Sequence, residues 1–111
     1  METVISQEAN VTVISITGRL DAVSAPELEG RLGQWMEQSG TALVMDFAQL
    51  DYISSAGLRI VLATAKKMKT KNGKFCLAGL RGGVKEVFEI SGFDSIIPVF
   101  ENRQAALEAA K

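Results

Sequence analysis

The sequence of 111 residues predicts an α/β fold, with a mixed sheet of four or five strands and about four helices. Two observations support this fold class. Short apolar runs rich in β-branched residues alternate with segments whose apolar residues recur at helical spacing. The first two runs are separated only by a turn, which predicts an N-terminal antiparallel hairpin. Later strands are reached through helices and are expected to pair in parallel through right-handed crossovers.

The hairpin is expected at the start of the chain. Residues 3–8 hold few apolar positions and predict a short edge strand, and Glu8-Ala9-Asn10 predicts the turn. Residues 11–17 alternate between apolar and hydroxyl side chains and are mostly β-branched, which favours a strand. Residues 18–21 are expected to end this strand.

The first helix is expected to begin at Ser24. Glu27 follows three residues later, which predicts a capping box in which the Ser24 hydroxyl bonds to the first turn. Gly30 and Gly33 weaken a helix, so we expect them to serve close packing. Residues 39–40, Ser-Gly, are expected to end the helix. One face of it is apolar and is formed by Leu28, Leu32, Trp35 and Met36.

The remaining elements alternate along the chain. A continuous apolar run at residues 41–47 predicts a strand buried on both faces, hence a central one. Further strands are expected at residues 74–78 and 96–100. Pro98 places the last strand at an edge of the sheet, because proline lacks a backbone N–H. Helices are expected from about residue 55 to 69, after Gly83 until Ser91-Gly92, and from 101 to 110.

The composition excludes several classes of function. The chain has 12 Lys and Arg against 13 Asp and Glu, which gives no electrostatic basis for binding nucleic acid or an anionic membrane. The apolar runs are short and no signal peptide opens the chain, so we expect a cytoplasmic protein with one domain at residues 1–111, monomeric when free. With no histidine and one cysteine, Cys76, we expect no metal site and no cofactor.

The stretch around Ser54 and Ser55 is the candidate functional site. It lies where the chain should turn from the central strand into the second helix, and Gly57 follows in the first turn. Serine is a preferred N-cap, so either hydroxyl could serve only to bond an unpaired N–H of the helix. One cap needs only one serine, however, and a glycine in the first turn would leave backbone N–H groups open to an incoming group.

The second helix has two different faces. At about 100° per residue, its core face is expected to contain Leu58, Val61, Leu62, Ala65 and Met68. On the other face, Ile60 forms a small apolar patch with Ala56 and Ala63, beside Arg59 and Lys67. This patch is either a partner-binding surface or the place where a neighbouring helix covers Ile60.

A phosphate at the start of this helix would act on binding rather than on the fold. It adds about −1.5 to −2 charge, which the dipole of a helix N-terminus favours by roughly 0.3–1 kcal/mol. A partner that docked here would meet a dianion. The loss of a few kcal/mol of binding free energy weakens affinity by about a hundredfold or more.

The segment of residues 50–58, Leu-Asp-Tyr-Ile-Ser-Ser-Ala-Gly-Leu, resembles the motif of bacterial anti-sigma factor antagonists, members of the STAS domain family. Residues 18–28 and 88–93 resemble two further family elements, so the likeness covers nearly the whole chain. The resemblance implies a partner-switching protein with a STAS-like fold. Family members bind an anti-sigma factor that is also a serine kinase. That kinase phosphorylates a serine at the start of the second helix, which ends the binding, and a dedicated serine phosphatase restores it.

Carried over to this chain, the phosphorylated serine is Ser55, and Ser54 is the second choice. Many relatives have Asp where this chain has Ser54, and often a hydroxyl where it has Ala56. Asp21 and Asp51 are expected near the serine, where they would shape the interface. The complete predicted partner-binding set is Asp21, Asp51, Ser54, Ser55, Ala56, Gly57, Arg59, Ile60 and Ala63.

Two other functions remain as alternatives. A STAS module could sense a ligand or assemble a complex without reversible phosphorylation. An enzyme with Ser55 as nucleophile would need a general base, and neither a histidine nor a lysine one turn after Ser55 supplies one. We therefore predict a binding module with no catalytic residues rather than an enzyme.

Overall fold

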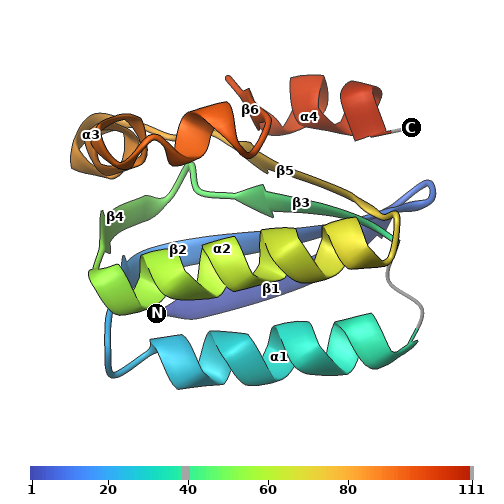
Figure 1. The fold of residues 1–111 in the computed structure, drawn as a ribbon, viewed down its shortest axis with the longest axis horizontal. Helices are drawn as coiled ribbons and strands as arrows, with labels where there is room; N and C mark the ends of the chain where they lie inside the picture. Colours follow the sequence, from blue (N-terminus) through green and yellow to red (C-terminus); the bar gives the residue numbers. More distant parts are fainter. Residues whose placement is uncertain (39–40, 111) are drawn as a thin grey trace.

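The architecture is a mixed sheet with helices on both faces (Figure 1). The computed structural model describes residues 1–38 and 41–110. The six strands follow the order β1-β2-β3-β5-β6, with β4 paired to the end of β2. Among the described residues only β1 and β2 pair antiparallel, which confirms the N-terminal hairpin followed by parallel strands. The elements are β1 (Glu2–Glu8), β2 (Val11–Leu20), α1 (Ala25–Gln38), β3 (Ala42–Asp46), β4 (Leu50–Ile53), α2 (Ser55–Thr70), β5 (Lys74–Ala78), α3 (Gly82–Ser91), the 3-10 helix η1 (Phe93–Ser95), β6 (Val99–Phe100) and α4 (Arg103–Ala110).

Strand β2 contributes to two cores, one on each face of the sheet. The larger core lies between the sheet and the helices α1, α2 and α3, and includes Ile14 and Ile16 of β2. The smaller core lies between the sheet and α4, and includes Val11 and Val13. Successive side chains of a strand point to opposite faces, so one strand can serve both cores. Strand β3 lies between β2 and β5, as its continuous apolar run predicted.

The strand β2 runs farther than predicted and reaches the candidate site. Its ladder becomes irregular between Gly18, which has a φ of 93°, and Arg19. Beyond this point β2 pairs with β4, a short strand that was not predicted, and Leu20 stands opposite Ile53. The end of β2 therefore lies beside the residues that lead into α2.

The last strand is shorter than expected, because residues before it form other structure. The N–H groups of Ile96 and Ile97 donate to the Phe93 carbonyl of the helix η1 (Phe93–Ser95) at 3.0 and 2.9 Å, so residues 96–98 do not extend the strand and β6 contains only Val99 and Phe100. It lies at the edge of the sheet, as Pro98 predicted. The helix end predicted at residues 39–40 lies outside the described residues.

The start of α1 does not use the predicted capping box. The Ser24 hydroxyl accepts a hydrogen bond of 2.9 Å from the Asp21 N–H and donates one of 2.9 Å to the Arg19 carbonyl, so it points back into the loop. The Asp21 carboxylate instead accepts from the Ser24 N–H at 3.1 Å. Gly30 and Gly33 do not serve close packing either, since a Cβ built on each meets no neighbouring described atom within 4 Å.

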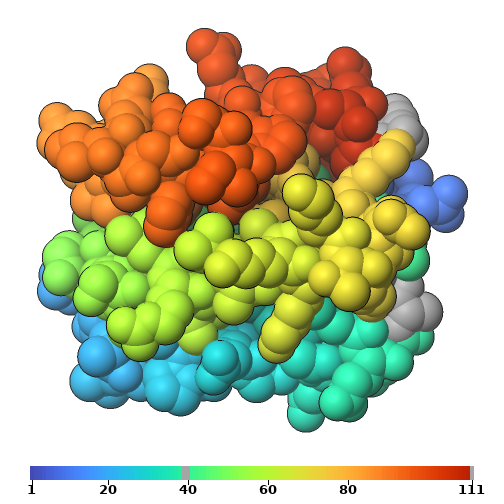
Figure 2. Space-filling view, in the orientation of Figure 1, coloured from blue at the N-terminus to red at the C-terminus, as the bar shows by residue number. Residues whose placement is uncertain are grey.

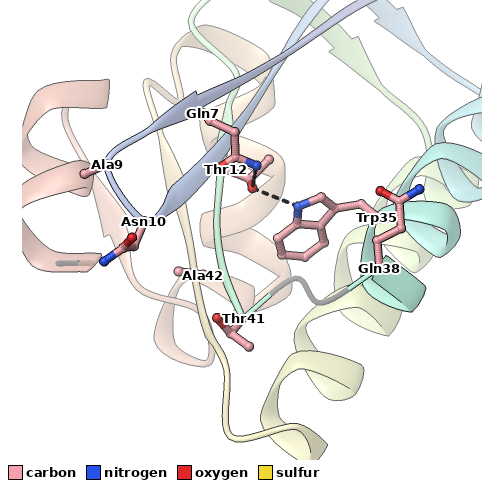
Figure 3. Close-up of a pocket in the computed structure, with 8 residues that line it drawn as sticks. All are labelled: Gln7, Ala9, Asn10, Thr12, Trp35, Gln38, Thr41 and Ala42. Atoms are coloured by element: carbon pink, nitrogen blue, oxygen red, sulfur yellow. Dashed lines mark hydrogen bonds between the residues drawn. The ribbon is translucent and has the colours of Figure 1, made fainter.

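Trp35 ties α1 to the sheet (Figure 3). Its Nε1 donates a hydrogen bond of 2.8 Å to Oγ1 of Thr12, which also accepts one of 2.7 Å from Nε2 of Gln7. These residues line a polar hollow of about 500 Å³, together with Asn10 and Gln38. The hollow lies by the β1–β2 turn, at the opposite end of the sheet from the start of α2 (Figure 1). It is therefore separate from the candidate site.

Candidate functional site

The two serines at the start of α2 differ in what their hydroxyls do. Ser54 is the N-cap, with φ −94° and ψ 174°, and its hydroxyl accepts a hydrogen bond of 3.3 Å from the Gly57 N–H. Ser55 is the first residue of the helix and is exposed. Its hydroxyl makes no hydrogen bond to another described residue. Ser54 thus stabilises the helix, whereas Ser55 presents its hydroxyl to solvent.

Gly57 does not open the helix start to an incoming group, contrary to expectation. It is buried, and its N–H is bonded to Ser54. A Cβ built on Gly57 would lie 2.8 Å from Cγ of Leu20, 2.9 Å from Cγ1 of Ile53 and 3.0 Å from the Leu20 carbonyl oxygen. Glycine therefore allows α2 to approach the ends of β2 and β4. Gly57 belongs to the packing beneath the site rather than to its surface.

Substitution of Gly57 by Ala is expected to lower the free energy of unfolding by about 1–3 kcal/mol, because the new methyl group overpacks a site walled partly by backbone. Thermal unfolding of the variant measures this. Gly30→Ala is the matched control, since Gly30 is exposed on α1 with open space around it. It should raise the stability by roughly 0.5–1 kcal/mol through helix propensity alone. Equal shifts for the two variants would contradict the packing role of Gly57.

Asp21 organises the loop beside the helix start. Its Oδ1 accepts hydrogen bonds from the N–H groups of Val23 at 3.0 Å and Ser24 at 3.1 Å. The bond from the backbone of Ser24 is the main cause that holds the pKa of Asp21 below its ordinary value, because it stabilises the ionised form. The loop is joined to α2 by a hydrogen bond of 2.9 Å from the Ser54 N–H to the Leu20 carbonyl. Asp21 thus directly follows the residue that accepts from the N-cap of α2, and Nε of Arg19 lies 3.8 Å from its carboxylate.

The second predicted acid, Asp51, lies on β4 four residues before Ser55 and is exposed. Its Oδ1 accepts a hydrogen bond of 3.2 Å from Nη2 of Arg81 at the start of α3. Nε of Arg81 also donates to the Ala48 carbonyl at 2.6 Å. Exposed ion pairs contribute only about 0–1 kcal/mol to stability. The pair therefore serves to position charge at the surface more than to hold the fold.

Val23 and Tyr52 are surface residues of the site that the sequence did not reveal. Val23 is 90% exposed in the loop after β2, and Tyr52 is 41% exposed on β4, with the Arg19 guanidinium 4.2 Å from its ring centroid. Exposed apolar groups among charges are typical of protein-binding surfaces. A single valine in a predicted turn gives no periodic signal. Burial along β4 does not alternate from residue to residue, so a search for alternating apolar residues does not identify Tyr52 as an exposed strand residue.

The exposed face of α2 is narrower than predicted. Ile60 is 9% exposed and belongs to the larger core, where it faces Leu32 and other residues of α1. The prediction that Ile60 lies on a partner-binding patch is therefore wrong, and the alternative, that a neighbouring helix covers it, is confirmed. Arg59 is exposed, whereas Ala56 and Ala63 are half-buried. Figure 2 shows the outer side of α2 as a band between α1 and the C-terminal segments.

The reactive group that this surface presents is the Ser55 hydroxyl, near charged side chains such as Arg59 and Asp51. Among residues 1–38 and 41–110, no cluster of Cys, Asp or Glu could hold a metal ion, and no helix is long and apolar enough to cross a membrane. Cys76 is buried as a small hydrophobe, and burial raises the pKa of its thiol to about 11. The thiol stays protonated at neutral pH and is a poor nucleophile.

The fold and the site define a class of protein, a small α/β domain that presents a serine at the first turn of a helix beside a charged, partly apolar surface. The chain belongs to the STAS domain family, whose model matches residues 2–106.

Known proteins similar to this chain include anti-sigma factor antagonists. BtrV of Bordetella bronchiseptica, which carries that description in its name, is 42% identical over 99 residues, covering 89% of this chain and 85% of BtrV. The crystal structure of an anti-sigma factor antagonist from Mycobacterium paratuberculosis matches with a TM-score of 0.90 and 31% identity, covering 98% of this chain and 92% of that one. Phosphorylated SpoIIAA of Bacillus matches with a TM-score of 0.79, covering 99% of this chain and 100% of SpoIIAA, and at 17% identity it shows the fold alone.

Proposed function

We propose that this chain is an anti-sigma factor antagonist that works by partner switching. The unphosphorylated surface around Ser55 binds an anti-sigma factor that is also a serine kinase, and phosphorylation of Ser55 ends the binding. The observation that carries this proposal is the contrast between the serines, since Ser54 caps α2 while the Ser55 hydroxyl is exposed and unbonded among the described residues. The functions named for BtrV and for the mycobacterial protein support it.

The surroundings of Ser55 suit a phosphate that changes binding without unfolding the chain. The first turn of α2 contains no acidic residue that would repel the phosphate. The helix dipole favours it, and Arg59, four residues later on the same side of the helix, is exposed. The carboxylates of Asp21 and Asp51 lie 3.8 and 3.2 Å from arginine nitrogens, so the phosphate adds net negative charge to a surface whose acids are already ion-paired. An acidic or apolar surface of a partner would then meet repulsion or a costly desolvation.

The same geometry supports a binding protein rather than an enzyme. The exposed Ser55 hydroxyl has no hydrogen-bonded base among the described residues, and activation of a serine nucleophile needs one. A kinase and a phosphatase can both reach an exposed side chain at the start of a helix. Val23 and Tyr52 supply the apolar contact area that a protein partner needs.

Intact-mass spectrometry with fragment mapping, on protein taken from its native cells with and without phosphatase treatment, tests the proposal. We expect one phosphate on Ser55 that the phosphatase removes. A phosphate on Ser54 would move the site by one residue and would require the helix cap to be replaced. No phosphate under any growth condition would contradict the switch and favour a STAS module that senses a ligand or assembles a complex.

A further inference from the structure

Strand β5 has an open edge at its N-terminal half. It runs from Lys74 to Ala78, and β3 pairs with its whole length on one side. On the other side β6 pairs only through Val99 and Phe100, which stand opposite Leu77 and Ala78 (Figure 1). Within the described residues no strand pairs with residues 74–76 on that side. An unpaired edge of a sheet is a template for another strand.

The backbone groups at this edge point outward. The Leu77 N–H donates to the Pro98 carbonyl at 2.9 Å, whereas the Lys74 N–H donates to the Thr41 carbonyl at 2.8 Å on the opposite side of the strand. Because successive residues of a strand direct their backbone groups to alternate sides, Phe75 shares the direction of Leu77. Its N–H and carbonyl therefore face the open edge.

Two apolar hollows flank this edge, one on each face of the sheet. A hollow of about 630 Å³ on the α2 side is lined by Leu62, Ala65 and Ile96, among others. A second hollow of about 390 Å³ on the α4 side includes Phe100 and Ala109. The residues common to both are Gly73, Phe75 and Pro98. Side chains of an added strand would alternate between the two faces and enter the hollows in turn.

The charged side chains that line the two hollows are, among the described residues, all lysines. Lys66 and Lys69 line the hollow on the α2 side, and Lys74 lines the other. Neither Lys66 nor Lys69 forms an ion pair with another described residue, and no acidic side chain lines either hollow among those described. Basic residues in the last turn of α2 also complement the helix dipole. Lys66 and Lys69 nevertheless line the same hollow, because residues three apart lie on one side of a helix. This surface is complementary to an acidic ligand.

We propose that the open edge of β5 binds an extended segment of a partner protein, which adds to the sheet as a strand, places consecutive apolar side chains in the two hollows and carries acidic residues toward Lys66 and Lys69. Strand addition takes affinity from backbone hydrogen bonds and specificity from the side-chain pockets. The edge lies at the far end of α2 from Ser55, so a chain bound here leaves the serine accessible.

The test uses the whole chain and a capped synthetic peptide with three consecutive valines between acidic residues. Amide hydrogen exchange and chemical shifts by NMR report binding residue by residue. We expect saturable binding that slows exchange of the Phe75 N–H and shifts the signals of Ile96. A peptide with methylated backbone nitrogens at the valines should not bind, because it lacks the ladder donors. Unchanged exchange at Phe75, or equal binding of the methylated peptide, would overturn strand addition.

Matched variants separate this surface from the rest of the chain. The double variant Lys66→Glu, Lys69→Glu should weaken peptide binding about tenfold or more, and Lys85→Glu on α3 should leave it unchanged. Ile96→Ser, at 63% exposure in the hollow, should weaken binding, whereas Ile90→Ser, at 87% exposure outside both hollows, should not. Equal affinity for a peptide with lysines in place of the acids would overturn the proposal. So would lysine-dependent binding to anionic vesicles without peptide binding, or self-association of the chain through this edge.

Discussion

Protein carrying phosphoserine at position 55 is expected to bind its anti-sigma factor about a hundredfold more weakly than the unmodified protein, a loss of roughly 2–3 kcal/mol. The phosphate stands at the first residue of α2, where the exposed hydroxyl of Ser55 makes no hydrogen bond to a described residue. The fold should persist, because the helix dipole stabilises the charge. Calorimetric titration of the anti-sigma factor with protein synthesised with phosphoserine gives the affinity, and circular dichroism checks the fold.

Three single substitutions serve as controls for this result. Ser55→Ala should bind as well as the unmodified protein and should resist the kinase. Ser55→Asp should weaken binding in the same direction but by less, about tenfold, because one carboxylate carries less charge than a phosphate. Ser54→Ala should instead lower the free energy of unfolding by about 0.5–2 kcal/mol through loss of the cap. Equal affinity of the unmodified and phosphorylated proteins would rule out the switch.

Local signals explain why most of the fold was predictable. The turn at Ala9, with φ 57°, and the end of α3 at Gly92, with φ 78°, fall where polar and glycine residues interrupt the apolar pattern. The helix predicted at residues 55–69 is observed at Ser55–Thr70, with Ser54 as cap. Each of these features depends on a few neighbouring residues, and the conformational preferences of those residue types for turns and helix ends are visible in the sequence.

The features that were missed depend on contacts between distant segments. Gly57 is buried against Leu20 and Ile53, whereas Gly30 and Gly33 have open space, although all three glycines look alike within a helical pattern. Strand β4 forms because β2 extends past its glycine to meet it. A local sequence pattern does not indicate which glycine packs against another element. It also does not indicate how many residues of a strand will pair with a neighbouring strand.

Which side of α2 is buried was also predicted only in part, because it depends on contacts with distant segments. The helix packs against both the sheet and α1, and Thr64 is buried with its hydroxyl bonded to the Ile60 carbonyl at 2.8 Å. Leu58, Leu62 and Ala65, which were expected in the core, are only half-buried. Periodicity locates an apolar side of a helix but does not state which neighbours cover it. The residues of α2 that are buried are Gly57, Ile60, Val61, Thr64 and Met68.

Ile60 and Arg59 are adjacent in sequence and are expected to give opposite results. Ile60→Ala removes a side chain that packs between α2 and α1, so it should lower the free energy of unfolding by about 2–4 kcal/mol and the melting temperature by roughly 10 °C. Arg59→Ala, on the exposed side, should change stability by less than about 0.5 kcal/mol. Thermal unfolding of both variants measures this difference.

The affinity of the same two variants for the anti-sigma factor completes the comparison, measured at a temperature where both are folded. Arg59→Ala should weaken binding, because Arg59 is exposed one turn after Ser55, on the side of α2 where we propose that the partner docks. Folded Ile60→Ala should bind nearly as well as the unmodified protein, since α1 covers the site of the lost side chain. The reverse outcome, a stable Ile60→Ala that no longer binds, would return Ile60 to the interface. It would also mean that α1 moves away from α2 when the partner docks.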